Sequence, residues 1–403
     1  MGLLGSVHSS VEGVMMSRRV FTLFFLAYFS STNWYALATD LVPKVFQTPL
    51  VEGFNWTGFG FDFMMASSML AASLILKKQD RLLILRFCAF ATIFLTLMLS
   101  LTSTSEMAII LLSSLGIPAG VASLALVTWF SEITVPIERG RVAGAVIAFS
   151  LLFGSFIVVF SRSLGATGSL GALLALNSTI IVLSFLKHEK PHADKPESSV
   201  PRFGKNYILY LAAWAFISMY NGFLSPLFGI YMKSVQGSGF VLEYMAGCVF
   251  ALLGGFLMDW YGRKPLLLLG IAFLGVSTSL IAFASNSYTF NLVYMASGVS
   301  WALFLPTFYL FIWVEASKSS RVFALALGLA IFHFMRSIGS VVYPLLSQMQ
   351  PIGLASISSI IIFLSMVPLV LANETLSQEE RESLRFSSYI HKVRREVERG
   401  QRA

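Results

Sequence analysis

The sequence predicts an all-α polytopic membrane protein with about twelve transmembrane helices. Of its 403 residues, 56% are hydrophobic and 12% are charged, and the mean hydropathy is +0.76. Apolar windows of about 19 to 25 residues, long enough to cross a bilayer as helices, recur about twelve times. These windows are too long for spanning strands and lack strict alternation, so helices must satisfy the backbone polar groups in lipid.

The predicted spans follow one another with short loops, and a longer polar segment lies near the middle of the chain. The twelve spans are residues 20–42, 57–76, 82–102, 107–130, 141–161, 169–187, 206–232, 240–258, 265–285, 290–314, 322–346 and 353–372. Five regions follow: residues 1–19 as a cytoplasmic N-terminus, 20–187 and 206–372 as two six-helix bundles, 188–205 as the linker between them, and 373–403 as a cytoplasmic amphipathic tail. Residues 1–19 do not resemble a cleaved signal, so we expect the first span to be retained.

The distribution of basic residues predicts the orientation of the chain. Of the 28 Lys and Arg residues, all but Lys44, Arg162, Lys233 and Arg336 fall at the N-terminus, in or next to the even-to-odd loops, or in the tail. Because Lys and Arg accumulate in cytoplasmic loops, both termini are predicted to be cytoplasmic, and the plasma membrane is the expected location. The net charge of +8 is explained by this bias and not by binding to nucleic acid, which favours one clustered basic patch.

A charged loop joins two of the predicted spans. It reads Gly255-Phe-Leu-Met-Asp-Trp-Tyr-Gly-Arg-Lys264 and resembles the loop motif of the major facilitator superfamily of secondary transporters, with Trp260 in place of the first Arg. A degraded copy, residues 73–81, lies about 182 residues earlier, with Lys77 at the position of the motif Asp and Asp80 at that of the motif Gly. The resemblance implies two pseudo-symmetric six-helix bundles that move a solute by alternating access.

A second signal is repeated at the ends of spans in both halves. Glu132 precedes Arg139 and Arg141, and Glu315 precedes Arg321. In the sugar, phosphate and organic-acid branches of the superfamily, such residues resemble a charge network that closes the cytoplasmic side; plain positive-inside topology with helix capping is the alternative. The predicted cytoplasmic gate comprises Asp259, Gly262, Arg263, Lys264, Lys77, Asp80, Arg81, Glu132, Arg139, Arg141, Glu315 and Arg321. We expect Asp259 to dominate this gate over Asp80.

One basic residue lies deep inside an apolar span. Arg336 is about fourteen residues into its span, where an unpaired charge costs at least about 2.5 kcal/mol, so it should face a cavity or a partner. At 100° per residue it shares a polar stripe with His333, Ser337 and Ser340. We expect Arg336 to bind an anionic group of the substrate or a mobile carboxylate, with a structural ion pair as the alternative. His333 is a candidate proton carrier or a hydrogen-bonded structural residue.

Three acidic residues in or near other spans are candidate partners and proton-coupling groups: Asp40, Asp62 and Glu243. Carboxyl groups in a low-dielectric cavity take up protons more readily, which favours proton coupling, although sodium coupling and uniport stay open. Asn33 shares a helix face with Asp40. The resemblance places Tyr220, Asn221 and Trp301 among the residues that line the cavity, so the candidate substrate-binding set is Arg336, His333, Asn33, Tyr220, Asn221 and Trp301.

The tail contains a capping-box spacing at Ser377 and Glu380, followed by apolar residues at helical spacing, which predicts an amphipathic helix that either binds anionic headgroups or packs under the bundles. No metal-ligand cluster, nucleotide loop or nucleophile motif occurs, and therefore neither an enzyme, a cofactor nor a metal site is predicted.

The sequence favours a monomeric carrier, with a small-molecule substrate, a coupling proton and the lipid bilayer as its partners. We expect proton-coupled uptake of a carboxylate-bearing metabolite by this symporter. The alternatives are a porter of a sugar-like neutral solute, a drug or metabolite efflux carrier and, more remotely, a membrane sensor that does not transport.

Overall fold

The computed structural model describes residues 18–45, 56–76, 79–102, 104–163, 165–184, 203–225, 239–283, 286–317, 321–384, 386 and 389–390. Within this part of the chain every regular element is a helix, and no strand occurs. The prediction of an all-α polytopic protein is therefore confirmed.

The described part of the first half of the chain forms six helices, one for each predicted span. They are α2 (Arg18–Val45), α3 (Trp56–Ile75), α4 (Arg81–Ser100), α5 (Ser105–Ile133), α6 (Arg139–Ser163) and α7 (Gly165–Ser184). The side chain of Asp80 accepts a hydrogen bond from the backbone of Leu82 and so caps the start of α4.

Six helical segments also form the described part of the second half. They are α8 (Lys205–Phe223), α10 (Gly239–Tyr261), α11 (Arg263–Ile281), α12 (Ser287–Phe304), α14 (Arg321–Leu346) and α15 (Pro351–Leu364). The α12 segment continues through a π-helical turn, η2 (Leu305–Phe311), into α13 (Ile312–Ala316), and α15 continues into α16 (Met366–Leu371). Nine helices in the described part of the chain are long and apolar enough to cross a membrane.

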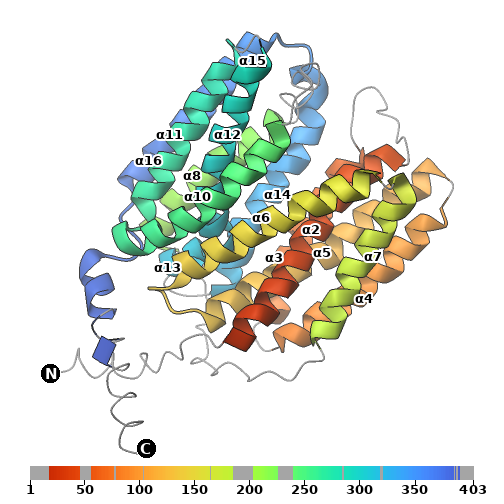
Figure 1. The fold of residues 1–403 in the computed structure, drawn as a ribbon, viewed down its shortest axis with the longest axis horizontal. Helices are drawn as coiled ribbons and strands as arrows, with labels where there is room; N and C mark the ends of the chain where they lie inside the picture. Colours follow the sequence, from red (N-terminus) through yellow and green to blue (C-terminus); the bar gives the residue numbers. More distant parts are fainter. Residues whose placement is uncertain are drawn as a thin grey trace, which may run out of the picture.

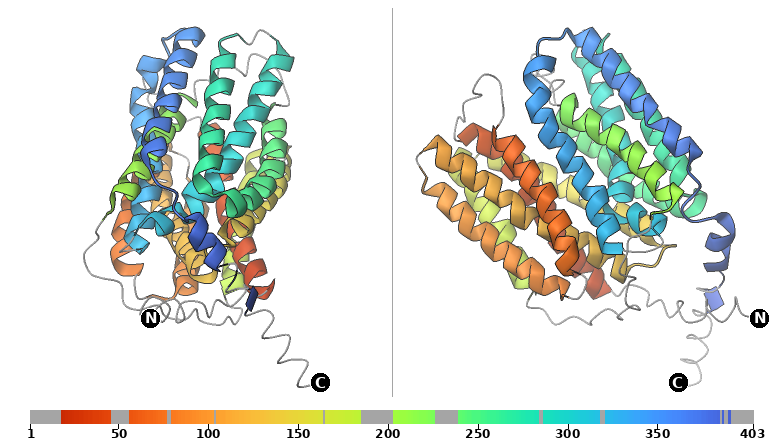
Figure 2. Two further views of the ribbon diagram at one scale, coloured as in Figure 1. Left: turned by 90° about the vertical axis from the view of Figure 1, so that its left-hand side faces the viewer. Right: turned by 180° about the vertical axis from the view of Figure 1, so that it is seen from behind.

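The helices form two bundles that lie side by side (Figures 1 and 2). One bundle contains α2 to α7 and the other α8 to α16, and they meet mainly where α6 packs against α10 and where α14 packs against α3. Large apolar side chains on the outside of both bundles are exposed, for example Phe87, Phe94, Phe256, Leu269 and Ile360. An apolar exterior of this extent suits contact with lipid tails and not with water.

The crossing of α6 and α10 depends on glycine. A Cβ atom added to Gly140 would lie 2.5 Å from the carbonyl oxygen of Gly255, and one added to Gly144 would lie 2.3 Å from that of Ala251. Small residues thus allow the two backbones to touch, as they do at many helix crossings in membranes. This contact positions the end of α10 against the start of α6.

The segment after α16 begins with the predicted capping box. The Ser377 backbone donates to the Glu380 carboxylate over 2.9 Å, and the Glu380 backbone donates to the Ser377 hydroxyl over 3.2 Å. Phe386 and Tyr389 are exposed, so these two side chains do not pack under the bundles.

Candidate functional site

Two groups of polar residues connect the bundles, one toward each end of the interface. We call the end where the Gly255–Lys264 loop joins α10 to α11 the motif end. Asp62 is the seventh of 20 residues in α3, which finishes at the motif end, and therefore lies in the opposite half. Arg336 is the sixteenth of 26 residues in α14, about 22 Å along a helix that starts at the motif end. The packing of α3 against α14 brings these two residues together.

Asp62 is the centre of the polar group in this opposite half. Its carboxylate accepts from Arg336 Nε at 3.2 Å, lies 2.8 Å from His333 Nδ1, and accepts from the Tyr35 hydroxyl at 3.4 Å. The Asp62 side chain is buried, and it comes from one bundle while Arg336 and His333 come from the other. An ion pair across the interface satisfies the buried charges and at the same time holds the bundles together.

Arg336 uses only part of its hydrogen-bonding capacity in contacts with the described residues. Among the described residues, its guanidinium group bonds to Asp62 through Nε alone, which leaves both terminal amino groups without a partner. The side chain is 31% exposed, and its Cζ atom lies 5.8 Å from the centre of the Tyr35 ring and 5.9 Å from that of Phe332. The two amino groups have the geometry that binds a carboxylate or phosphate in a bidentate manner.

His333 is buried beside this pair. Its Nδ1 atom faces Asp62, whereas Nε2 has no hydrogen-bond partner among the described residues. Its ring packs edge-on against Tyr35 at 5.8 Å and against Phe332 at 5.3 Å. The ring of Tyr309, on η2, lies 5.4 Å from that of Phe332. Aromatic rings from α2, η2 and α14 therefore surround the Asp62 and Arg336 charges.

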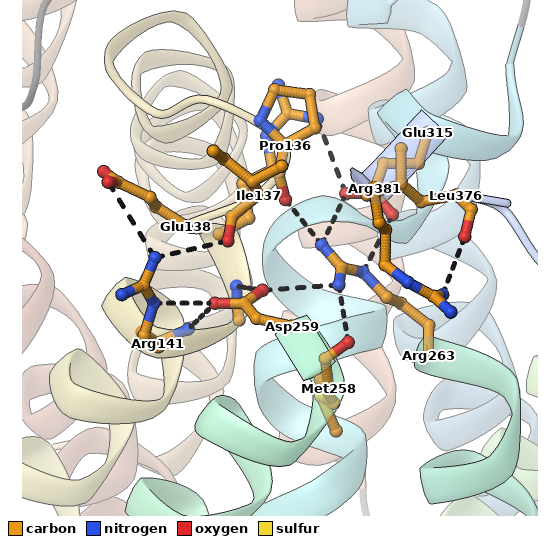
Figure 3. Close-up of polar contacts among 12 residues, drawn as sticks. Pro136, Ile137, Glu138, Arg141, Met258, Asp259, Arg263, Glu315, Leu376 and Arg381 are labelled. Atoms are coloured by element: carbon orange, nitrogen blue, oxygen red, sulfur yellow. Dashed lines mark hydrogen bonds and ion pairs between the residues drawn. The ribbon is translucent and has the colours of Figure 1, made fainter. Parts of the chain in front are cut away.

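The motif end contains the second group of contacts between the bundles (Figure 3). The buried Asp259 carboxylate, near the end of α10, accepts from the backbone N–H groups of Gly140 at 3.0 Å and Arg141 at 2.9 Å. It also accepts from Arg141 Nε at 3.2 Å. These N–H groups belong to the first turn of α6, where the helix dipole favours a negative charge.

Arg263 and Glu315 extend this group. Arg263 is fully buried and donates to the Glu315 carboxylate, to the Met258 carbonyl and, across the interface, to the Pro136 carbonyl at 2.6 Å. Glu315 also forms an ion pair with Arg139 of the other bundle at 3.7 Å. Several charges thus take part in contacts between the two bundles at this end, and Figure 3 shows the bond from Arg263 to Pro136 across the interface.

The loop after α10 is stabilised by the segment that follows α16. Gly262 has a φ of 110°, which favours glycine, and a Cβ atom there would lie 2.4 Å from Glu374 Oε2. Glu374 accepts from the backbone N–H groups of Arg263 and Lys264, each at 3.0 Å, and so caps α11. The Lys264 ammonium group donates to the Val370 carbonyl.

The copy of the motif in the first bundle makes no such contact across the interface among the described residues. Asp80 caps its own helix, and Arg81 donates to the Glu132 carboxylate at 2.7 Å and to the Leu76 carbonyl. These partners all lie in one bundle. Lys77 lies outside the described residues, and Arg321 forms the start of α14.

The contacts described for the other predicted site residues are with residues other than Asp62, His333 and Arg336. Asn33 is buried, donates to the Phe29 carbonyl and faces Gly154 of α6. Trp301 packs edge-on against Phe304, and the Tyr220 hydroxyl accepts from Thr278. Asn221 is partly buried near the end of α8, and the Asp40 side chain lies outside the described residues. Glu243 accepts from the Ser297 hydroxyl at 2.7 Å.

Sequence reasoning did not assign four residues that take part in these contacts. The Tyr35 hydroxyl on α2 bonds to Asp62 on α3, and only the tertiary structure brings these two residues together. Glu374, Thr375 and Ser297 bind backbone or carboxylate groups from distant parts of the chain. Of these residues, only Glu374 could have been predicted from the sequence, because a carboxylate directly after the last span is well placed to cap a neighbouring helix.

No group of His, Cys, Asp and Glu in the described part of the chain has the geometry of a metal site.

Comparison with known proteins gives a family match and 223 matching chains of solved structures. Residues 166–304 match the family model described as "Sugar (and other) transporter". The structure of the human organic anion transporter MFSD10 (TETRAN) has a TM-score of 0.72 at 12% identity, covering 87% of this chain and 99% of the other. The proton:xylose symporter XylE, bound to 6-bromo-6-deoxy-D-glucose, has a TM-score of 0.69 at 12% identity, covering 91% of this chain and 98% of the other. No curated protein sequence matches the chain significantly.

Two helical bundles joined by polar contacts at both ends of one interface have the architecture of membrane carriers that work by alternating access. The family-model match over residues 166–304 and the shared fold show that the chain has the fold of the major facilitator superfamily transporters, that of a multi-pass membrane protein. The matching proteins are transporters, which confirms the prediction that the chain is not an enzyme.

Proposed function

We propose that this transporter moves a small organic anion, with Arg336 as the group that binds the substrate carboxylate. The observation that carries the proposal is the unused end of the Arg336 guanidinium group. Both of its terminal amino groups lack a partner among the described residues, although the side chain lies inside an apolar span and is 31% exposed. A charged group with open donors in a membrane span is expected to serve a ligand or an ion.

Asp62 links anion binding at Arg336 to the contact between the two bundles. It neutralises Arg336 when no anion is bound, and it competes with an incoming carboxylate for the same positive charge. Because Asp62 belongs to one bundle and Arg336 to the other, anion binding weakens the contact between α3 and α14. The substrate would thus loosen the interface at the end opposite the motif, as alternating access requires.

Proton coupling, uptake across the plasma membrane, cytoplasmic termini and a monomeric state belong to the same proposal. The buried carboxyl group of Asp62 and the partly buried one of Glu243 support coupling to protons, and the basic loops support the orientation. Asp40 remains a further candidate for proton coupling on sequence grounds.

A sugar-like neutral solute is the second candidate substrate. It is favoured by the family-model match described as "Sugar (and other) transporter" and by the fold shared with a proton:xylose symporter. The aromatic rings around Arg336 would suit the apolar faces of a sugar. In that case Arg336 and Asp62 would act as a permanent ion pair between the bundles.

Thermal stabilisation of the purified protein by panels of organic anions and neutral sugars tests the proposal. A ligand at about 100 times its dissociation constant adds about 2.7 kcal/mol to the stability, which gives a measurable rise in melting temperature. The test variant is Asp62→Asn/Arg336→Gln, because removal of Arg336 alone leaves the Asp62 charge without its cation. Lys205→Gln, which removes one positive charge at an exposed position, is the matched control.

An anion that stabilises the wild type and Lys205→Gln, but not the double variant, supports the proposal. The same anion should then enter liposomes that contain the wild type. Equal stabilisation of all three proteins by neutral sugars, with none by anions, would refute the assignment of Arg336 and make the sugar-like substrate the leading candidate.

A further inference from the structure

We propose that Glu243 is the carboxyl group that binds the coupling proton, and that Asp62 stays ionised. This inference rests on the proposed proton coupling and selects one of its candidate groups. It depends on how differently the structure surrounds these two carboxyl groups.

Asp62 has the surroundings of a carboxylate. It accepts from a guanidinium group and a tyrosine hydroxyl and lies 2.8 Å from a histidine nitrogen. Removal of the Asp62 charge would leave Arg336 without a counter-charge inside the membrane span. The ionised form of Asp62 is therefore the stable one in this arrangement.

Glu243 has the surroundings of a neutral acid. It lies in the second turn of α10 and is partly buried, and the only hydrogen bond of its carboxyl group among the described residues is the one with the Ser297 hydroxyl. No Lys, Arg or His side chain in the described part of the chain pairs with it. Burying an ionised carboxylate without a cation beside it costs free energy. A protonated carboxyl group, in contrast, can donate or accept a single hydrogen bond with a serine.

The groups that face Glu243 from neighbouring helices are also neutral. The hydroxyl groups of Tyr220 on α8 and Tyr294 on α12 lie within electrostatic range, and Ser297 belongs to α12. From α6, the apolar side chain of Leu151 packs near Gly247, one turn further along α10. None of these groups supplies a positive charge that would keep Glu243 ionised.

The position of Glu243 explains how a proton could affect transport. A Cβ atom on Gly298 would lie 2.2 Å from the Glu243 carbonyl oxygen, so α10 and α12 touch at this point. Uptake of one proton by the carboxylate gives a neutral group that bonds to Ser297 and lets the two helices stay packed. Release of that proton leaves a charge which must become hydrated, and the contact between α10 and α12 then loosens. No covalent bond changes in this step.

Infrared spectroscopy of the full-length protein in lipid tests the inference without any substrate. A protonated carboxyl group in a dry site has a distinct C=O stretching band that shifts on exchange into deuterium oxide. We expect this band in the wild type at neutral pH, its loss in Glu243→Gln and its retention in Asp62→Asn. In Ser297→Ala the band should shift in frequency, since the hydrogen bond to the carboxyl group is gone.

Glu243→Gln is expected to fold, because glutamine is neutral and its side-chain oxygen still accepts from Ser297. Its melting temperature should stay close to that of the wild type. A band that persists in Glu243→Gln, disappears in Asp62→Asn, or is missing from the wild type at neutral pH would overturn the inference. These results are independent of the thermal-shift test with anions, so failure of one proposal is distinguishable from failure of the other.

Discussion

The contact between Asp259 and the first turn of α6 gives a sharp prediction about the closed motif end. Asp259→Asn keeps the size of the side chain and removes its charge. The carboxylate accepts from two backbone N–H groups of the other bundle, Gly140 at 3.0 Å and Arg141 at 2.9 Å. An asparagine has one oxygen, so at most one of these donors keeps its acceptor while the other faces an amide NH2 group.

The size of the effect follows from these contacts. A buried donor that loses its partner costs about 1 to 3 kcal/mol, and the lost charge at the helix N-terminus adds about 0.3 to 1 kcal/mol. The ion pair with Arg141 adds little, because that side chain is 41% exposed. The ion pair with the buried Arg263 lies within one bundle, so its loss does not itself favour the open over the closed form. A total near 3 kcal/mol shifts the equilibrium between the closed and open motif end by roughly 100-fold toward the open form.

Distance measurements between spin labels can detect this shift. We would label Ile137, in the loop before α6, and Tyr261, an exposed residue at the end of α10, after replacement of Cys88 and Cys248 by serine. In Asp259→Asn the distribution should gain a longer distance that is rare in the parent protein.

Asp80→Asn is the matched control. Asp80 occupies the related place in the first bundle, but it caps its own helix, and asparagine caps helices equally well. The distances in this variant should equal those of the parent. If instead Asp80→Asn lengthened the distance and Asp259→Asn left it unchanged, the predicted dominance of Asp259 in the gate would be refuted.

Three further predictions concern the packing at the motif end. Gly140→Ala places a Cβ atom 2.5 Å from a carbonyl oxygen of α10 and should lengthen the distance between the two spin labels. Gly171→Ala, whose added Cβ atom would have nothing within 4 Å, should leave that distance unchanged. The same distances in both variants would contradict the close crossing of α6 and α10. Gly262→Ala should lower the stability by about 1 to 3 kcal/mol because of its positive φ, while Gly204→Ala should have a small effect, and a melting curve in detergent decides this. Glu315→Gln should cost about 3 to 5 kcal/mol, since it removes the counter-charge of the buried Arg139 and one of the two counter-charges of the buried Arg263. An unchanged melting temperature for Glu315→Gln would show that this charge network does not stabilise the fold.

The helices and their number were readable in the sequence. All twelve predicted spans match helical segments in the described part of the chain. The reason is that lipid tails offer no hydrogen bonds to the backbone. An apolar stretch of membrane-spanning length must therefore form its own backbone hydrogen bonds, and a helix forms them between residues close in sequence. The π-helical turn at Leu305–Phe311 had no sequence signal beyond Pro306, because it depends on how the rest of the bundle packs around it.

The residues of the candidate site were partly readable. Arg336 and His333 stood out because charged and titratable groups are rare in apolar spans, and Asp62 and Glu243 stood out for the same reason. The loop motif indicated Asp259, Arg263 and the other residues near the gate through its resemblance to a family.

The sequence by itself determined that this is a helical membrane protein built from two related halves. It also identified the charged residues inside apolar spans, which need a partner of opposite charge or a polar cavity. Only the tertiary structure decided the partners: Asp62 pairs with Arg336, Glu243 has a serine alone among the described residues, and Asp80 caps its own helix instead of reaching the other bundle. Helix formation depends on neighbours in the chain, whereas an ion pair between residues 274 positions apart depends on which helix faces pack together.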